Sequence, residues 1–240
     1  YEIRNQIYTK NTEYIACRQN LSKNLHFRKT FVYLSVTCNS ITEMLTKEEL
    51  TDAYKNFNDQ KILNLAMNES KSLREDAIPI LESEIKRRNL DIKLLDWIKL
   101  ERNFFKGAEL QNLKKEIQNS ECSECGKKFN NVQGFNIHYL SALDSTFDSE
   151  IIVCENCGKQ LRKKSYIKTA TLGFLSFRGI INVPFYFIGE LIASFSRKKR
   201  SEKIIEEFIF QNTGLIREYG NEKVYELIGH HNIQQAKQNE

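Results

Sequence analysis

Apolar residues recur at helical spacing along most of the chain that follows residue 43. The segment Thr46-Lys-Glu-Glu49 has the pattern of a capping box, and the next apolar positions on one face are Leu50, Ala53, Tyr54 and Phe57. Later stripes with the same spacing contain Ile78, Leu81, Ile85, Leu90, Leu95, Ile98, Leu110, Leu113 and Ile117. These stripes predict a bundle of short helices over residues 44–119.

Polar residues and helix breakers indicate where these helices begin. Ser72-Leu-Arg-Glu75 has a second capping-box pattern, although Pro79 beyond it implies either a kink or a later helix start. Asp91 is a candidate cap for the next helix, with Ile92 pointing inward. Both signals are predictions about local structure that a tertiary fold can override.

The most apolar stretch covers residues 169–196, which contain only two charged residues, Arg178 and Glu190. Its longest uncharged run has eleven residues, from Gly179 to Gly189, and a membrane-spanning helix needs about 20. Asn182 is a candidate cap after which Pro184 fits a first helical turn, so two short segments are expected. The second segment has one apolar face, formed by Phe185, Ile188, Leu191, Ile192 and Phe195.

Basic residues flank this stretch on both sides. They are Arg162, Lys163, Lys164 and Lys168 before it, and Arg197, Lys198, Lys199, Arg200 and Lys203 after it. Such flanks suit a hydrophobic hairpin over residues 169–200 that dips into the inner leaflet of a membrane and returns. Two other interpretations remain open: the hairpin is the core against which the helices of 46–118 pack or a groove for a protein partner, or the stretch is a true membrane span.

The remaining C-terminal residues, 201–240, return to a helical pattern. Ser201 is a candidate cap, followed by an inward face of Ile204, Ile205, Phe208 and Ile209, and Gly214 is the expected stop. A last helix is expected from about Asn221. The adjacent His230 and His231 would point in different directions on it and are expected at the surface.

Residues 1–43 show weak periodicity and are interpreted as a weakly structured N-terminal extension. The first methionine is Met44, which suggests the hypothesis that the functional chain starts there. An ordinary N-terminal domain is the alternative.

Four cysteines form two copies of one short motif in the middle of the chain. Cys122 and Cys125 precede Gly126, and Cys154 and Cys157 precede Gly158. Two cysteines separated by two residues can direct both sulfurs to one point, and two such pairs supply the four thiolates of a tetrahedral Zn²⁺ site. A glycine after each pair suits a turn that requires positive φ.

These motifs resemble the zinc-ribbon proteins, in which two CxxCG knuckles on β-hairpins hold one structural metal. The resemblance covers about residues 120–165, within a predicted zinc-ribbon domain over residues 120–168, and it implies Zn²⁺ and a local fold rather than an activity. The β-branched Ile151, Ile152 and Val153 before Cys154 are typical of the expected strand. The predicted fold class is therefore mainly α with a small β zinc ribbon: a short-helix bundle, the ribbon, the apolar hairpin and C-terminal helices.

His138 offers an alternative ligand set. It follows Cys125 after twelve residues, as in the first half of a C₂H₂ finger, but no second histidine stands at positions 142–144. A site of three cysteines with His138, or no metal at all, remains open beside the four-cysteine site.

Composition limits the function classes. The net charge of +5 over 240 residues, with both signs interspersed, does not by itself indicate nucleic-acid binding. Six cysteines without a dense disulfide pattern favour a reducing compartment, and so a cytoplasmic location that includes a peripheral or monotopic position on the inner face of the membrane. No P-loop, Gly-x-Ser-x-Gly or His-Glu-x-x-His motif occurs, and four thiolates close the coordination sphere of zinc.

The sequence therefore predicts a non-enzymatic adaptor, with no catalytic residue, no small-molecule substrate and no cofactor besides structural Zn²⁺. Residues 169–200 would contact a membrane surface or a protein partner. One alternative is a nucleic-acid-binding protein that uses the basic segment 159–168 and Tyr166. A second is a thiol oxidoreductase that uses one CxxC pair, although Glu124 and Asn156 stand where such pairs often have proline.

Overall fold

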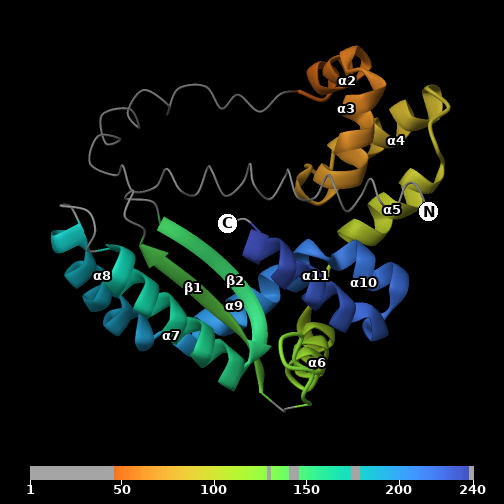
Figure 1. Ribbon diagram of the computed structural model, residues 1–240. Coiled ribbons are helices and arrows are strands. Elements are labelled where there is room, and N and C mark those ends of the chain that lie inside the picture. Colours follow the sequence, from red (N-terminus) through yellow and green to blue (C-terminus); the bar gives the residue numbers. More distant parts are fainter. Residues whose placement is uncertain (1–45, 129–130, 141–145, 174–178, 238–240) are drawn as a thin grey trace. The chain divides into compact units, whose positions relative to one another are not determined.

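The computed structural model describes residues 46–128, 131–140, 146–173 and 179–237 (Figure 1). The chain divides into two compact units, one ending at Arg102 and the other beginning at Asn103. The predicted N-terminal extension, residues 1–43, lies outside the described residues, and so does the hypothetical start at Met44.

The first unit is helical in its described part. It contains α2 (Lys47–Asn56), α3 (Asp59–Asn64), a π-helical turn (Leu65–Glu69), a 3-10 turn (Ser70–Ser72), α4 (Ala77–Arg87) and α5 (Lys93–Arg102). Both hydrogen bonds of the capping box between Thr46 and Glu49 form. Tyr54, Leu81 and Ile98 from the predicted stripes are buried in the core of this unit. The prediction of short, packed helices is confirmed here.

Two predicted helix signals in this unit are wrong. Ser72 and Glu75 form no capping box, because Ser72 Oγ donates to Glu69 O and Glu75 pairs with Arg102. Helix α4 instead begins at Ala77, which places Pro79 in its first turn, where a missing N–H costs no helical hydrogen bond. Ile92 is 69% exposed rather than inward, because it precedes α5, whose own apolar face fills the core.

The second unit is organised around a two-stranded antiparallel sheet. Strands β1 (Val132–Leu140) and β2 (Thr146–Cys154) pair so that Gly134 lies opposite Ile152 and Asn136 opposite Glu150. The helices of this unit are α6 (Gly107–Gln118), α7 (Glu155–Leu172), α8 (Gly179–Ser194), α9 (Arg197–Gln211), α10 (Thr213–Tyr219) and α11 (Val224–Lys237), with a 3-10 turn at Asn221–Lys223.

Helices cover both faces of this sheet because alternate strand residues project to opposite sides. Phe135 packs against Gly158 in α7, and its neighbour Gly134 packs against Ile204 in α9 on the other face (Figure 1). Helix α6 is joined to this unit by the ion pair between Lys114 Nζ and Glu206 Oε1, at 2.8 Å.

Side chains from the helices form hydrogen bonds with both outer edges of the sheet. On β2, the Asn232 amide from α11 pairs with both the N–H and the carbonyl of Ile152, each at 2.8 Å, as a peptide group of a third strand would. On β1, the hydroxyls of Ser201 and Thr169 accept from the N–H groups of Gly134 and Leu140. Unpaired strand edges are costly, so these bonds explain how a sheet of two strands is sustained.

Helix α8 runs unbroken from Gly179 to Ser194 with Pro184 inside it, so the predicted break and the Asn182 cap are wrong. It contacts β1 and α7 through side chains on one face. Val183 is buried, Tyr186 Oη donates to the carbonyl of His138 at 2.7 Å, and Glu190 Oε1 lies 3.0 Å from His138 Nε2. Most of the apolar side chains of α8 therefore point away from the sheet.

Three C-terminal signals also differ from expectation. Helix α9 begins at Arg197, so Ser201 is an interior residue whose hydroxyl bonds Gly134 rather than a cap. Gly214 is buried within α10, and the residue that ends α10 is Gly220, with φ of 78°. His231 Nε2 lies 2.7 Å from Glu150 O, so this histidine binds the edge of β2 instead of standing free at the surface.

The inward face of α9, including Ile205 and Phe208, is buried as predicted.

Candidate metal centre

The first cysteine pair forms a tight turn stabilised by two backbone bonds. The N–H of Gly126 donates to Cys122 O at 2.8 Å, and the N–H of Cys122 donates to Lys127 O at 3.0 Å. Gly126 has φ of 67°, a conformation that is strained for any residue with a Cβ. The expected role of this glycine in a knuckle is therefore confirmed.

The second pair lies on a helix instead of a second knuckle. Cys154 ends β2 and is the N-cap residue of α7, and Cys157 lies in the first turn of that helix. Thiolates at this position are favoured by the positive end of the helix dipole. The expectation of two similar knuckles on hairpins is correct for the first pair only.

All four sulfurs nevertheless converge. The Sγ atoms of Cys122, Cys125, Cys154 and Cys157 lie within 4.8 Å of one another, and those of Cys125 and Cys154 are 3.9 Å apart. A tetrahedron with Zn–S bonds of about 2.3 Å has sulfur–sulfur edges of roughly 3.8 Å. Four thiol donors at this spacing fit a tetrahedral, thiophilic ion, and the cluster is compatible with a zinc-ribbon-like site.

The surroundings of the sulfurs favour a bound cation. Burial raises the pKa of the Cys154 and Cys157 thiols, and the neighbouring sulfurs raise that of Cys157 further. Burial also opposes ionisation of Cys122, but backbone N–H groups, foremost that of Cys154 at 3.3 Å, outweigh it and lower its pKa. Several thiolates cannot crowd together without compensation, and a divalent ion supplies that compensation.

His138 is not part of this cluster. It lies on β1, and its Nε2 is 3.0 Å from Glu190 Oε1, while the metal-compatible group found among the described residues contains only the four cysteines. The three-cysteine alternative with His138 is therefore wrong. Spacing along the sequence could not reveal this, because strand β1 carries His138 away from the knuckle.

Asn232 is a contributor that the sequence did not indicate. Its Nδ2 donates to Ser123 Oγ, inside the first knuckle, at 2.7 Å, and to Ile152 O, two residues before Cys154, at 2.8 Å. One side chain of α11 thus holds both cysteine segments in register. Its sequence neighbourhood contains no signal for this role, since the contact spans about a hundred residues.

Gly158 has a packing role, which differs from the expected positive φ. A Cβ at this position would lie 2.3 Å from two carbon atoms of the Phe135 ring. We expect Gly158→Ala to lower the free energy of unfolding by about 1–3 kcal/mol, because the ring or the helix must move. Urea unfolding of the metal-loaded protein measures this.

Gly229→Ala is the matched control, since it also replaces a helical glycine of the second unit. A Cβ there meets nothing within 4 Å, so this variant should be neutral or more stable by roughly 0.5–1 kcal/mol. Equal unfolding free energies for the two variants would contradict the packing role of Gly158.

No protein-family model matches this chain, and comparison with curated proteins and with solved structures finds no match.

Proposed function

We propose that this chain is a non-enzymatic adaptor in which structural Zn²⁺ organises the second unit and α8 docks on an anionic membrane surface. The observation that carries the proposal is the outward face of α8. This face is formed by Ile181, Phe185, Ile188, Leu191 and Ile192, and it continues to Phe195 just after the helix; all are between 54% and 88% exposed. The proposed location is accordingly the inner face of the cytoplasmic membrane.

The polarity of α8 is the reverse of that expected for a helix covering a sheet. Glu190, its only charged residue, turns inward and is bonded by His138 and by Tyr166 Oη, the latter at 2.7 Å. Among the residues that the structure describes, fourteen large hydrophobic side chains are exposed, and seven of them lie between residues 181 and 195. A face this apolar supports a docking role, because soluble surfaces rarely gather such side chains.

Charge indicates a membrane rather than an apolar protein groove. Exposed Arg197, Lys198 and Lys199 directly follow Phe195, and exposed lysines at 163, 164 and 168 lie along α7. Each basic residue near an anionic leaflet contributes about 1 kcal/mol, and each apolar side chain that enters the acyl boundary contributes about 1.5–3 kcal/mol when fully buried. The combination is typical of helices that lie in the membrane interface.

No helix among the described ranges is both long and apolar enough to cross a bilayer. A helix of 16 residues whose only charged side chain packs on the protein and whose apolar face is exposed suits a position along the membrane surface. The predicted hairpin is therefore replaced in this proposal by a single interfacial helix.

The alternative functions have less support. Tyr166, the aromatic residue expected to help bind nucleic acid, has its hydroxyl bonded to Glu190 and packs against the rings of Tyr186 and Phe187. A redox-active CxxC pair needs one thiol that is both accessible and lowered in pKa. Cys122 has a lowered pKa but is buried, and Cys154 is buried with a raised pKa.

Sedimentation of the full chain with vesicles tests the proposal. We expect it to pellet with vesicles containing phosphatidylserine, to bind neutral vesicles less, and to be partly released at about 500 mM salt, where charges are screened within roughly 4 Å. A monomer that stays in the supernatant with anionic vesicles at low salt would refute membrane docking. A stable dimer that binds no vesicle would also refute it and would assign the face to a second copy of the chain.

A further inference from the structure

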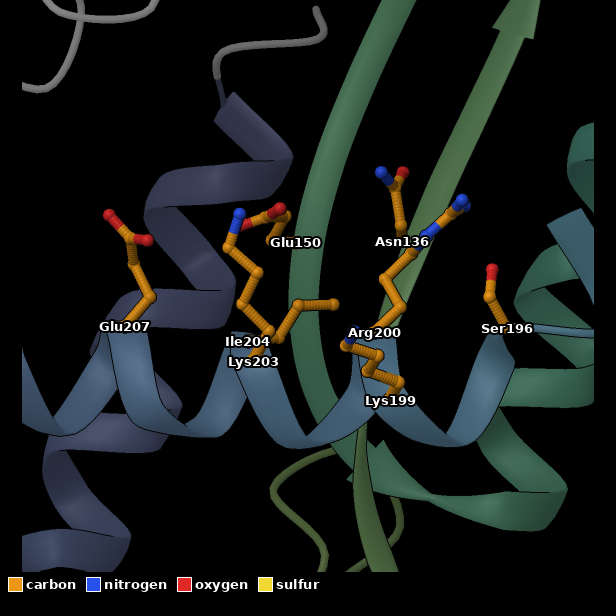
Figure 2. Close-up of a pocket in the computed structure, with 8 residues that line it drawn as sticks. All are labelled: Asn136, Glu150, Ser196, Lys199, Arg200, Lys203, Ile204 and Glu207. Carbon is orange, nitrogen blue, oxygen red and sulfur yellow. The ribbon is translucent and has the colours of Figure 1, made fainter.

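A polar cavity of about 340 Å³ lies between the sheet and one side of α9 (Figure 2). Asn136 and Glu150, which are opposite each other on β1 and β2, line it from the sheet. A stripe on α9 lines the other side: Ser196, Lys199, Arg200, Lys203 and Glu207. In Figure 2, Arg200 extends toward Asn136, and Lys203 extends toward Glu150.

Among the described residues, cations outnumber carboxylates at the N-terminal end of this stripe. Arg162 from α7 and Arg197 line a smaller adjoining cavity that shares Asn136 and Arg200 with the first. Burial lowers the pKa of Arg162, and the charges of Arg197 and Arg200 lower it further. Glu190 is the one carboxylate lining the adjoining cavity, and His138 and Tyr166 already bind it.

The direction of α9 increases this imbalance. Its first turn contains Arg197, Lys198, Lys199 and Arg200 and no acidic residue. The positive end of the helix dipole repels these four cations. An anion bound there would be attracted both by the helix dipole and by the cations. The local sequence is thus unfavourable for the helix alone and favourable for a helix with a bound anion.

Two buried polar atoms at the same place lack partners. Within the described part of the chain, Arg162 Nε and Asn136 Oδ1 are inaccessible to solvent and make no hydrogen bond. Buried polar atoms are normally hydrogen-bonded, so this part of the molecule contains polar atoms whose hydrogen bonds are not made. Rotation of the Asn136 amide about χ2 would exchange the positions of its oxygen and its NH₂ group, and would bring one or the other closer to the cavity.

The far end of the cavity has the opposite chemistry. Glu150 and Glu207 lie there, and the pKa of Glu150 is raised by partial desolvation and by the charge of Glu207. Carboxylates are acceptors for hydroxyl groups. One ligand could therefore place an anion against the arginines and hydroxyls against the glutamates.

We propose that this cavity binds a small phosphorylated polyol. Its phosphate lies against Lys199, Arg200 and the first turn of α9, with the charge of Arg162 in the adjoining cavity behind them, and its hydroxyls donate to Glu150 and Glu207. The polyol phosphate has two sources, a soluble metabolite or the headgroup of an inositol lipid. This site goes beyond the docking function, because a free ligand can fill it without any membrane.

Calorimetric titration of the metal-loaded full chain with inositol monophosphate, free inositol and inorganic phosphate tests the site. We expect inositol monophosphate to bind more tightly than inorganic phosphate, and free inositol not to bind. Arg200→Gln should weaken the binding of inositol monophosphate at least about tenfold, since a charge-assisted pair is lost. Lys198→Gln removes the same charge two positions away, from a side chain that does not line the cavity, and should change Kd less than about twofold.

Glu150→Gln should strengthen the binding of an anion, whereas Arg200→Gln should weaken it. Removing this carboxylate should tighten the binding of inorganic phosphate, because one repulsive charge is lost. The raised pKa of Glu150 means that its ionised form costs stability at neutral pH, so the variant should remain folded. Thermal unfolding with and without inositol monophosphate checks folding, and the wild type should gain more from the ligand than Arg200→Gln.

Vesicles distinguish the two sources. If the lipid is the source, phosphatidylinositol vesicles should bind the chain more tightly than phosphatidylserine vesicles of equal charge, and Arg200→Gln should abolish the difference. If a metabolite is the source, only the soluble probe should bind selectively. Absence of binding by all three soluble probes, equal weakening by Arg200→Gln and Lys198→Gln, or equal affinity for phosphate and inositol monophosphate would each overturn the site. A failure of vesicle docking alone would leave it intact.

Discussion

Cys154→Ser should release the metal and abolish the cooperative unfolding transition of the second unit. Cys154 is the last residue of β2, the N-cap of α7 and one of the four converging sulfurs, so its loss affects the sheet, the helix and the metal together. Binding of structural zinc in small modules contributes about 10–16 kcal/mol, which exceeds the stability of an ordinary domain. Cys122→Ser, in the knuckle, should have a similar effect.

Metal content by mass spectrometry and circular dichroism during heating measure this result. We expect one zinc per wild-type chain and none in either variant, and a chelator should reproduce the variants' loss of structure. Cys17→Ser and Cys38→Ser are the controls, since these cysteines are outside the cluster in sequence and should leave metal content unchanged. A Cys154→Ser chain that retained metal and unfolded like the wild type would refute a four-sulfur centre.

Leu191→Glu with Phe195→Glu should lower vesicle affinity by about a hundredfold or more. Their side chains are 66% and 88% exposed, so neither substitution removes core packing. Each removes up to about 2 kcal/mol of apolar transfer and adds a charge that an anionic leaflet repels by about 1 kcal/mol. Every 1.4 kcal/mol corresponds to roughly a tenfold change in affinity. If the effects of the two substitutions add, the loss of vesicle affinity is larger than a hundredfold.

Ile233→Glu is the matched control for this change. Ile233 lies on α11 and is 55% exposed, so the same chemical substitution falls on another helix. It should reduce vesicle binding only slightly, through net charge. Equal losses in the α8 and α11 variants would show that binding depends on overall charge and would remove α8 as the docking surface. Unchanged binding of inositol monophosphate by the α8 variant would confirm that the cavity acts separately.

Motifs whose physics is local were predictable. The first cysteine pair forms the expected turn, because its backbone bonds join residues at most five positions apart, and the β-branched residues before Cys154 form the expected strand. The capping box at Thr46 forms because its bonds join residues three positions apart. The same reasoning failed at Ser72, where Arg102 from a different helix takes Glu75 away from the cap.

The direction in which a helix turns its apolar face was not predictable, because it depends on the elements that pack against the helix in the folded chain. The apolar stripe of α8 was recognisable from its spacing, but spacing is the same for a helix that faces a core and one that faces outward. Tyr186 and Glu190 decide between them by binding His138 on the open edge of β1. The polar residues thus hold the helix with its apolar face outward.

The amino-acid sequence by itself determined the two CxxC pairs that supply the cysteine cluster, the mainly helical character and the positions of the strongest apolar stripes, since each depends on residues close together in the chain. Tertiary structure alone decided that the second cysteine pair opens a helix, that α8 exposes its apolar face, and that cations from α7 and α9 surround one cavity with Asn136. The reason is that these features arise from contacts between elements far apart in the chain, and such contacts leave no periodic signal in any one of them.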